Sequence, residues 1–211
     1  MLKRLAIAIV SLSFVFAADA KTWRTENFDF DSTGVSMVEI EHPVGELEIA
    51  AGPSERIEVQ MRVECSSRRN RCGERIEDIE LVSGGSGSTL TLRVEGFPKT
   101  TNSLTVDLQV TMPARMSLDI DRGVGETTVR NIAGDISVEA GVGEVRITAP
   151  VSSIGEVRAE CGVGEVDLDV PDGRIEKDGF LFLGNELTWQ GEGASFIDVE
   201  IGVGSVNIDL E

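Results

Sequence analysis

The sequence predicts an all-β protein: a parallel β-helix or β-solenoid with coils of about twenty residues, preceded by a wider, partly antiparallel strand-rich half. Three observations predict this fold. A short glycine-containing phrase recurs through the second half of the chain, and the residues after each glycine alternate between apolar and polar. No segment shows the 3.6-residue period of an amphipathic helix. Such a repeat identifies an architecture more readily than an activity.

The repeated phrase is Gly-Val-Gly followed by an alternating run, as in GVGEVRI and GVGEVDL. Its second glycine recurs with spacings of 18, 21 and 40 residues, at Gly125, Gly143, Gly164 and Gly204. Gly184 lies midway in the longest gap, so we expect a degenerate coil there and successive coils stacked in chain order. In that coil the apolar residues are Leu187 and Trp189, one position later than in the others, which predicts a bulge or a longer turn.

The alternation after each glycine predicts half-buried strands. Val145 and Ile147 are expected to point inward, and Glu144 and Arg146 outward. Stacked coils would then build a core from equivalent aliphatic residues about 4.8 Å apart. The same phase places these residues inward: Val166, Leu168, Val170, Val206, Ile208 and Leu210.

Residues 21–121 form the strand-rich half, and residues 122–211 form the glycine-repeat half of the same domain. An early VGELEI echoes the repeat, with Leu47 and Ile49 in the inward phase. Further strands are expected over 56–63, 76–82, 89–96, 103–113 and 116–123. The first half would cap one end of the stack, whereas the last repeat would leave an open C-terminal edge suited to self-association.

Residues 1–20 have the features of a secretory signal peptide. Lys3 and Arg4 precede an apolar run over residues 5–16, and residues 18–20 read Ala-Asp-Ala. We expect cleavage after Ala20. An uncleaved anchor is disfavoured because the apolar run is shorter than the ~20 residues that a bilayer needs. The mature chain is expected in the periplasm or at the cell surface, without a transmembrane segment.

The chain is strongly acidic, with a formal net charge of −18. Nucleic acids and anionic lipid surfaces repel such a protein, so both are poor partners. Carboxylates at outward strand positions keep a long β surface soluble and discourage pairing between sheet edges.

Cysteine usage agrees with export. Cys65 and Cys72 enclose the six residues SSRRNR, and we expect a disulfide to close this loop in an oxidising compartment. The alternative is a pair of reduced thiols. Cys161 is left unpaired and is expected to be a small buried hydrophobic residue.

The same loop concentrates positive charge in Arg68, Arg69, Arg71 and Arg75. Such a cluster could bind a phosphate, an acidic glycan or an acidic protein surface. The alternative is a solvated loop whose arginines lie against the protein's own acidic strands. We treat these four arginines as the candidate partner-binding residues.

Stacked coils would also align Glu126, Glu144 and Glu165 in an outward ladder. Like charges one coil apart repel, so water must screen them, arginines such as Arg146 must interleave, or a cation must lie between them. Calcium β-rolls have consecutive glycines and an aspartate two residues later, whereas here glutamate follows the glycine directly. We therefore predict no metal and no cofactor.

Catalytic motifs are nearly absent. His42 is the single histidine, precedes Pro43 and is expected at a surface turn. The sequence has no HExxH, no GxSxG and no zinc-spaced cysteines. GVGEVR fails as a dinucleotide-binding fingerprint because a strand follows it instead of a helix. Aromatic platforms for carbohydrate are scarce, so the protein is not expected to be an enzyme.

Three stretches carry a resemblance to a known family: HPVGELEIAAG at 42–52, VTMPARMSLDIDRGVGETTV at 110–129, and the glycine repeats through residue 210. They resemble the bacterial exported "putative adhesin" β-solenoid domains of unknown function, which are related to autotransporter-adhesin heads. The resemblance covers nearly the whole mature chain. It implies a right-handed parallel β-helix and contributes no catalytic residue.

The leading hypothesis is a non-enzymatic exported β-solenoid that serves as an adhesin-like binding or structural module at the cell envelope, with an unknown protein or glycan as partner. One alternative is an envelope sensor or regulatory partner-binding protein that uses the arginine loop or an open edge. The other is a β-helix carbohydrate-active enzyme, which the missing aromatics and the lack of a recognisable acid pair disfavour.

Overall fold

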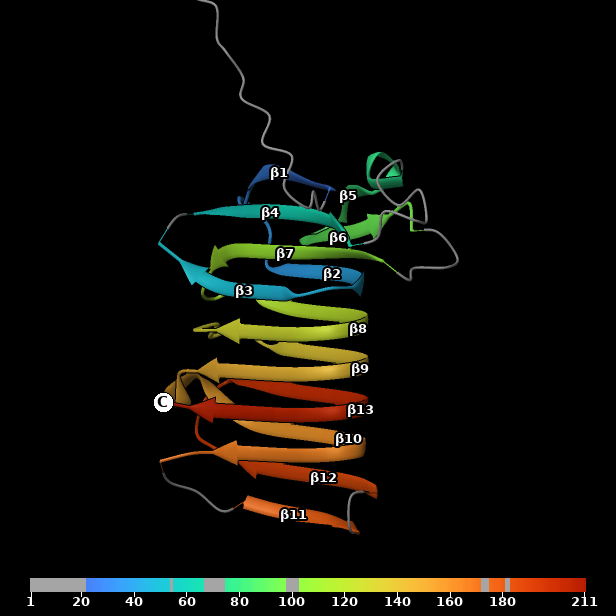
Figure 1. The fold of residues 1–211 in the computed structure, drawn as a ribbon. Helices are drawn as coiled ribbons and strands as arrows, with labels where there is room; N and C mark the ends of the chain where they lie inside the picture. The colour runs from blue at the N-terminus through green and yellow to red at the C-terminus, as the bar shows by residue number, and fades with distance from the viewer. Residues whose placement is uncertain (1–21, 54, 67–74, 98–102, 172–174, 181–182) are drawn as a thin grey trace, which may run out of the picture.

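The protein is all-β, as predicted. The computed structural model describes residues 22–53, 55–66, 75–97, 103–171, 175–180 and 183–211. Within them the strands form one mixed sheet of parallel and antiparallel pairs, stacked one above another (Figure 1). The predicted signal peptide lies outside the described residues.

The first half forms one end of the stack (Figure 1). Its elements are β1 (Thr22–Asp31), β2 (Met37–Val44), β3 (Leu47–Gly52), β4 (Arg56–Cys65), the 3-10 helix η1 (Ile76–Asp78), β5 (Glu80–Ser86), β6 (Thr89–Glu95) and β7 (Leu104–Pro113). The partly antiparallel character is confirmed, because β4 pairs antiparallel with both β1 and β7. The strand expected over 76–82 is wrong at its start, where Ile76 and Ile79 are both buried and their three-residue spacing suits the turn of η1.

The second half contains four long strands that carry the repeated phrase. They are β8 (Ser117–Arg130), β9 (Ile136–Ala149), β10 (Ile154–Asp169) and β13 (Ser195–Leu210). These strands pair in parallel with their phrases in register, so Gly143 lies opposite both Gly125 and Gly204, and Gly204 lies opposite Gly164. A 3-10 turn, η2 (Val151–Ser153), precedes β10.

The order of these strands differs from the prediction. The sheet runs β8-β9-β13-β10-β12-β11, so β13 lies between β9 and β10 (Figure 1). The intervening β11 (Ile175–Phe180) and β12 (Leu183–Gln190) form a hairpin, and β12 therefore runs antiparallel to β10. The expectation of coils stacked in chain order is wrong, and so is the open edge expected at the last repeat. Among the described strands, the sheet edges are β1, β5 and β11.

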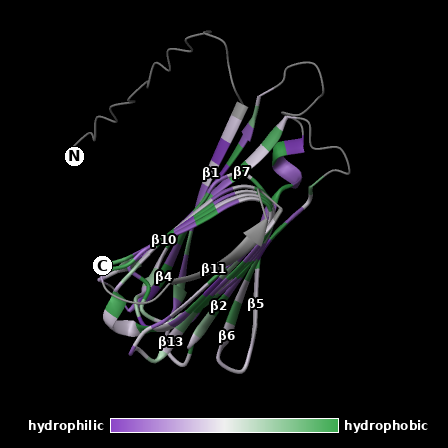
Figure 2. Ribbon diagram, turned by 90° about the horizontal axis from the view of Figure 1, so that it is seen from below, coloured by the Kyte–Doolittle hydropathy of each residue, from purple (hydrophilic) through white to green (hydrophobic). Residues whose placement is uncertain are grey.

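Burial shows how each long strand encloses the core. In β9 the buried residues are even-numbered before the Gly-Val-Gly phrase, up to Ala140, and odd-numbered after it, from Val145. The strand therefore bends at the phrase, and its two arms face each other across one interior (Figure 2). The predicted inward residues are buried, with Val170 partly so, and Leu187 and Trp189 of the degenerate unit are buried as well. Leu47 and Ile49 also lie in the core.

Candidate functional site

The bend of each long strand, which we call the glycine corner, is a position that only glycine fits. The second glycine of each phrase has a φ between +137° and +150°. A Cβ on Gly143 would lie 1.8 Å from the carbonyl oxygen of Gly125, and one on Gly204 would lie 1.7 Å from that of Gly143. Positive φ and close backbone approach each require glycine. The corners are therefore fixed one above another along the stack.

The middle residue of each phrase points outward and forms the valine row. Val124, Val142, Val203 and Val163 are 48%, 46%, 46% and 47% exposed, and they lie in register across β8, β9, β13 and β10. Neighbouring strands are about 4.8 Å apart, so the row is a continuous apolar strip. Contiguous exposed apolar surface of this kind marks interaction sites.

Beside the valine row lies the acidic face, the outward side of β8, β9 and β13 before the corner. A carboxylate stands two residues before each phrase. Asp121, Glu139 and Glu200 are in register on adjacent strands and lie side by side on the outer surface. Asp119 and Asp198 belong to the next outward row. All five are exposed. Asp198 lies opposite Arg158 of β10, and its charge helps to raise the pKa of Arg158, whereas Asp119, Asp121, Glu139 and Glu200 form no ion pair or hydrogen bond with a described side chain. Like charges directly opposite in a sheet destabilise it, so this face carries an uncompensated repulsion.

The carboxylate row continues beyond the acidic face into β10 and β12. Glu200 lies opposite Glu160, which lies opposite Glu186. Here an arginine side chain lies among the carboxylates. Arg158 is hydrogen-bonded to Glu160, and its Nε lies 3.6 Å from Glu186 Oε1. The hydrogen bond to Glu160 and the charge of that carboxylate raise the pKa of Arg158. Arg158 thus compensates carboxylates of β10 and β12, and it also lies opposite Asp198 at the border of the acidic face.

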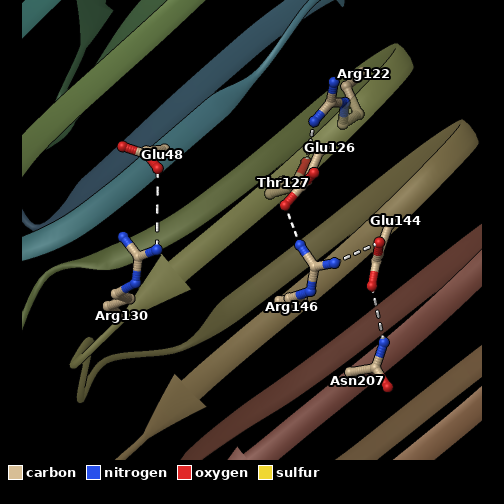
Figure 3. Close-up of polar contacts among 8 residues, drawn as sticks. All are labelled: Glu48, Arg122, Glu126, Thr127, Arg130, Glu144, Arg146 and Asn207. Carbon is tan, nitrogen blue, oxygen red and sulfur yellow. Dashed lines mark hydrogen bonds and ion pairs between the residues drawn. The ribbon is translucent and has the colours of Figure 1, made fainter.

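The face on the other side of the corner, which we call the paired face, is compensated on β8 and β9. Arg146 binds Glu126 on the adjacent strand, and its second terminal nitrogen lies 2.6 Å from Glu144 Oε2 (Figure 3). Asn207 donates to Glu144 over 3.3 Å. An arginine therefore interleaves between Glu126 and Glu144, which is one of the three arrangements predicted for this ladder. Arg130 extends the pattern toward β3, 3.9 Å from Glu48.

A small hollow lies at the end of the carboxylate row. Its volume is about 230 Å³, and its polar lining is Glu160, Glu186, Glu200 and Asn185. The hollow forms where β12 departs from the corner geometry, because Asn185 takes the place opposite Cys161 and donates a 2.5 Å hydrogen bond to the carbonyl of Gly164. Three carboxylates from three strands thus converge on one depression.

His42 is a buried residue of β2, so the expected surface turn is wrong. It is 1% exposed, and its Nε2 donates to the carbonyl oxygen of Val106 over 2.7 Å. Burial lowers the pKa of His42 to about 4. The opposite residue on β8, Arg122, is 4% exposed, hydrogen-bonds Thr127 and donates to the carbonyl of Gly45 over 2.6 Å. Burial lowers the pKa of Arg122 to about 10.

The other residues singled out from the sequence lie elsewhere. Arg68, Arg69, Arg71 and Cys72 are outside the described residues, so both the partner-binding loop and the disulfide stay predictions. The described members of that loop are Cys65, buried at the end of β4, and Arg75, exposed before η1. Cys161 is 1% exposed, as expected, with its thiol 3.5 Å from the carbonyl of Gly204.

Two findings concern metals and membranes. Among the described residues, no group of three or more His, Cys, Asp and Glu side chains has an arrangement that could hold a metal ion. No described helix is long and apolar enough to cross a bilayer.

The acidic face and the valine row were not singled out from the sequence, although both leave a signal there. A carboxylate stands two residues before every Gly-Val-Gly, at Asp121, Glu139, Glu160 and Glu200. Alternation also places His42 in the inward phase of Val38 and Ile40. The missing information was spatial, because only the register across strands turns separate residues into rows.

Comparisons with known proteins identify the fold. No protein-family model matches the sequence, and no curated protein does. The solved structure of a "putative cell adhesion protein" from Clostridium sporogenes matches with a TM-score of 0.52 and 17% sequence identity, over 90% of this chain and all of that one. At this identity the match shows a shared fold alone.

Two other solved structures match with lower scores. A "putative adhesin" from Bacteroides fragilis has a TM-score of 0.31 and 10% identity, over 89% of this chain and 97% of that one. A "putative lipid binding protein" from Parabacteroides distasonis has a TM-score of 0.29 and 12% identity, over 89% of this chain and 96% of that one. In its fold, the chain is thus similar to the Clostridium cell adhesion protein.

Proposed function

We propose that this protein is a non-enzymatic, exported binding module of the bacterial cell envelope, adhesin-like in fold, whose repeat half is a β-solenoid. The observation that carries the proposal is the acidic face next to the valine row. Four exposed carboxylates without an ion pair among the described residues, Asp119, Asp121, Glu139 and Glu200, lie beside four half-exposed valines in register, and this combination is what an interaction surface requires.

The scaffold supports a binding role. The glycine corners hold both rows on hydrogen-bonded strands, and sites on strands are more precise than sites on loops. The shared fold with a protein named for cell adhesion agrees with this role, and export is expected from the predicted signal peptide. Among the described residues, no group of three or more His, Cys, Asp and Glu side chains could hold a metal ion.

A binding experiment tests this function. Fluorescently labelled mature chain, residues 21–211, is titrated onto purified envelope fragments from the bacterium that makes it. We expect saturable binding that weakens as salt rises. A variant with the acidic face neutralised, D121N/E139Q/E200Q, should lose most of the binding, because these are the carboxylates without partners.

The matched control is E126Q/E144Q/E165Q, which removes the same number of charges after the corner. It should keep its binding, because Arg146 already compensates part of that face. Unchanged binding by the acidic-face variant would contradict the proposal. Release of reducing ends from envelope glycans by the wild-type chain would also overturn it, in favour of a carbohydrate-active enzyme.

A further inference from the structure

We infer that the glycine corner binds a basic, extended polypeptide segment in which cationic and apolar residues alternate. The inference rests on the proposed binding function and deepens it by naming the chemistry of the partner. It follows from three features that lie side by side: the valine row, the acidic face and the hollow at its end.

The valine row supplies the apolar part of the surface. The four valines are nearly half exposed, and each is flanked by glycines that have no side chain to cover it. The corner requires glycine on either side of this position, but the exposed middle residue is free to be polar. Val44 of β2 continues the row next to Val124 and is partly buried. Covering this strip removes apolar surface from water along the whole stack.

The acidic face sets the charge of the partner. Asp121, Glu139 and Glu200 lie next to the corner with no cation to compensate them among the described side chains. A second copy of this chain is equally acidic and would be repelled, as would nucleic acid. A cationic segment relieves the repulsion between the carboxylates and gains their attraction.

The hollow provides an anchor for one cationic side chain. Glu160, Glu186 and Glu200 converge on a volume of about 230 Å³, and Arg158 compensates only the first two. An ammonium or guanidinium group entering the hollow would meet the carboxylate of Glu200, which has no ion partner among the described residues. Charge-assisted hydrogen bonds of this kind are the stronger ones in proteins.

The geometry of the rows favours an extended, alternating segment. Side chains of an extended chain point alternately to opposite sides. One side can then lie over the valines while the other lies over the carboxylates, which stand three residues before them on each strand. From Asp121 to Glu186 the row crosses four strand spacings of about 4.8 Å, or about 19 Å, which an extended segment of about six residues spans.

Synthetic peptides test the inference directly. A fluorescein-labelled peptide of alternating lysine and valine, KVKVKVKV, is titrated with mature protein at low salt. Three comparison peptides are KSKSKSKS, the block peptide KKKKVVVV and EVEVEVEV. We expect KVKVKVKV to bind at least tenfold more tightly than KSKSKSKS and the block peptide, and EVEVEVEV not to bind. Raising the salt should weaken the binding.

Variants then locate the peptide. D121N/E139Q/E200Q should weaken KVKVKVKV binding at least tenfold, and V142S/V203S should abolish the preference over KSKSKSKS. The control E126Q/E144Q/E165Q should bind within threefold of wild type. Circular dichroism and thermal unfolding verify that each variant folds, and all eight substituted side chains point outward.

Four results would overturn the inference. Equal affinity for KVKVKVKV and KSKSKSKS would remove the role of the valine row. Equal loss in the acidic-face and control variants would show attraction by net charge alone. If no peptide binds while the wild-type chain still binds envelope through its acidic face, the inference is wrong and the proposed function stands. If envelope binding is also absent, both fail.

Discussion

The acidic face and the paired face meet at the same corner, belong to the same strands and cover the same interior, yet they are built in opposite ways. After the corner, Arg146 lies between Glu126 and Glu144. Before it, Asp121, Glu139 and Glu200 repeat across three strands with no described partner. The fold does not impose this difference, because either face could carry arginines at outward positions. On β8 and β9 the carboxylates after the corner are therefore compensated by an arginine, whereas those before the corner are not.

The largest expected loss of stability comes from a substitution at the glycine corner, which positions both faces. In G143A the new Cβ would lie 1.8 Å from the carbonyl of Gly125 at a φ of +150°, so the corner must open. We expect the free energy of unfolding to fall by about 4 kcal/mol or more, measured by urea denaturation. G141A is the matched control, because its contact with Gly123 is longer, at 2.7 Å, and its loss should be clearly smaller. Equal losses would show that the corner is not the constraint.

The second prediction separates the contribution of buried His42 to the pH dependence of stability from the contribution of the surface carboxylates. The pKa of His42 is lowered from 6.5 to about 4 by burial. The unfolded chain therefore binds a proton as the pH falls through 6.5, while the folded chain does not until about pH 4. The contribution of neutral His42 to the free energy of unfolding is fully present above pH 6.5. The free energy of unfolding should fall by about 3 kcal/mol between pH 6.5 and 4.

Urea denaturation across that pH range measures the loss. In H42Q, where an amide can still donate to Val106, the same interval should show only the change that the carboxylates contribute. If the wild type and H42Q have parallel pH profiles, His42 is not the titrating group.

The third prediction is that neutralising the two faces changes the free energy of unfolding in opposite directions. D121N/E139Q/E200Q removes repulsion between opposed carboxylates and should raise the free energy of unfolding by about 1 kcal/mol at low salt. E126Q/E144Q/E165Q removes the partners of Arg146 and should lower it by about 0.5–1 kcal/mol. Both differences should shrink in about 0.5 M NaCl. Changes of the same sign would mean that the two faces do not differ in compensation.

The smallest effect concerns Arg146 alone. The side chain is 46% exposed, so R146Q should lower the free energy of unfolding by only about 0.5 kcal/mol, measured by thermal unfolding at low salt. The carboxylates left behind would then resemble the acidic face. A double-mutant cycle with E126Q should show coupling between the two residues, and strictly additive losses would contradict the interleaving.

Much of the fold could be predicted because the repeat encodes it locally. Glycine positions and the alternation after them predicted the inward residues, such as Val145 and Ile208. The degenerate coil expected at Gly184 is wrong, because β12 runs antiparallel to β10. The position of β13 could not be predicted. Its phrase pairs with that of β9 in the register that β8 also uses, so the sequence does not distinguish the possible neighbours.

The candidate site was harder to predict than the fold. Its residues are ordinary outward positions on single strands, and they become a surface only when the register aligns them. His42 was missed for another reason. The adjacent Pro43 favours a turn, but the alternation from Val38 continues through it, and tertiary burial decides the outcome.

The place of β13 has a consequence for how the protein acquires its shape. A polypeptide is synthesised from its N-terminus, so β9 and β10 are made before the segment that separates them. Both carry the same phrase, and each offers the other a matching partner until β13 inserts. The native pairing of β9 and β10 with β13 therefore forms only after the C-terminal segment is present. In an ordinary repeat protein, by contrast, each repeat packs on the one that precedes it in the chain.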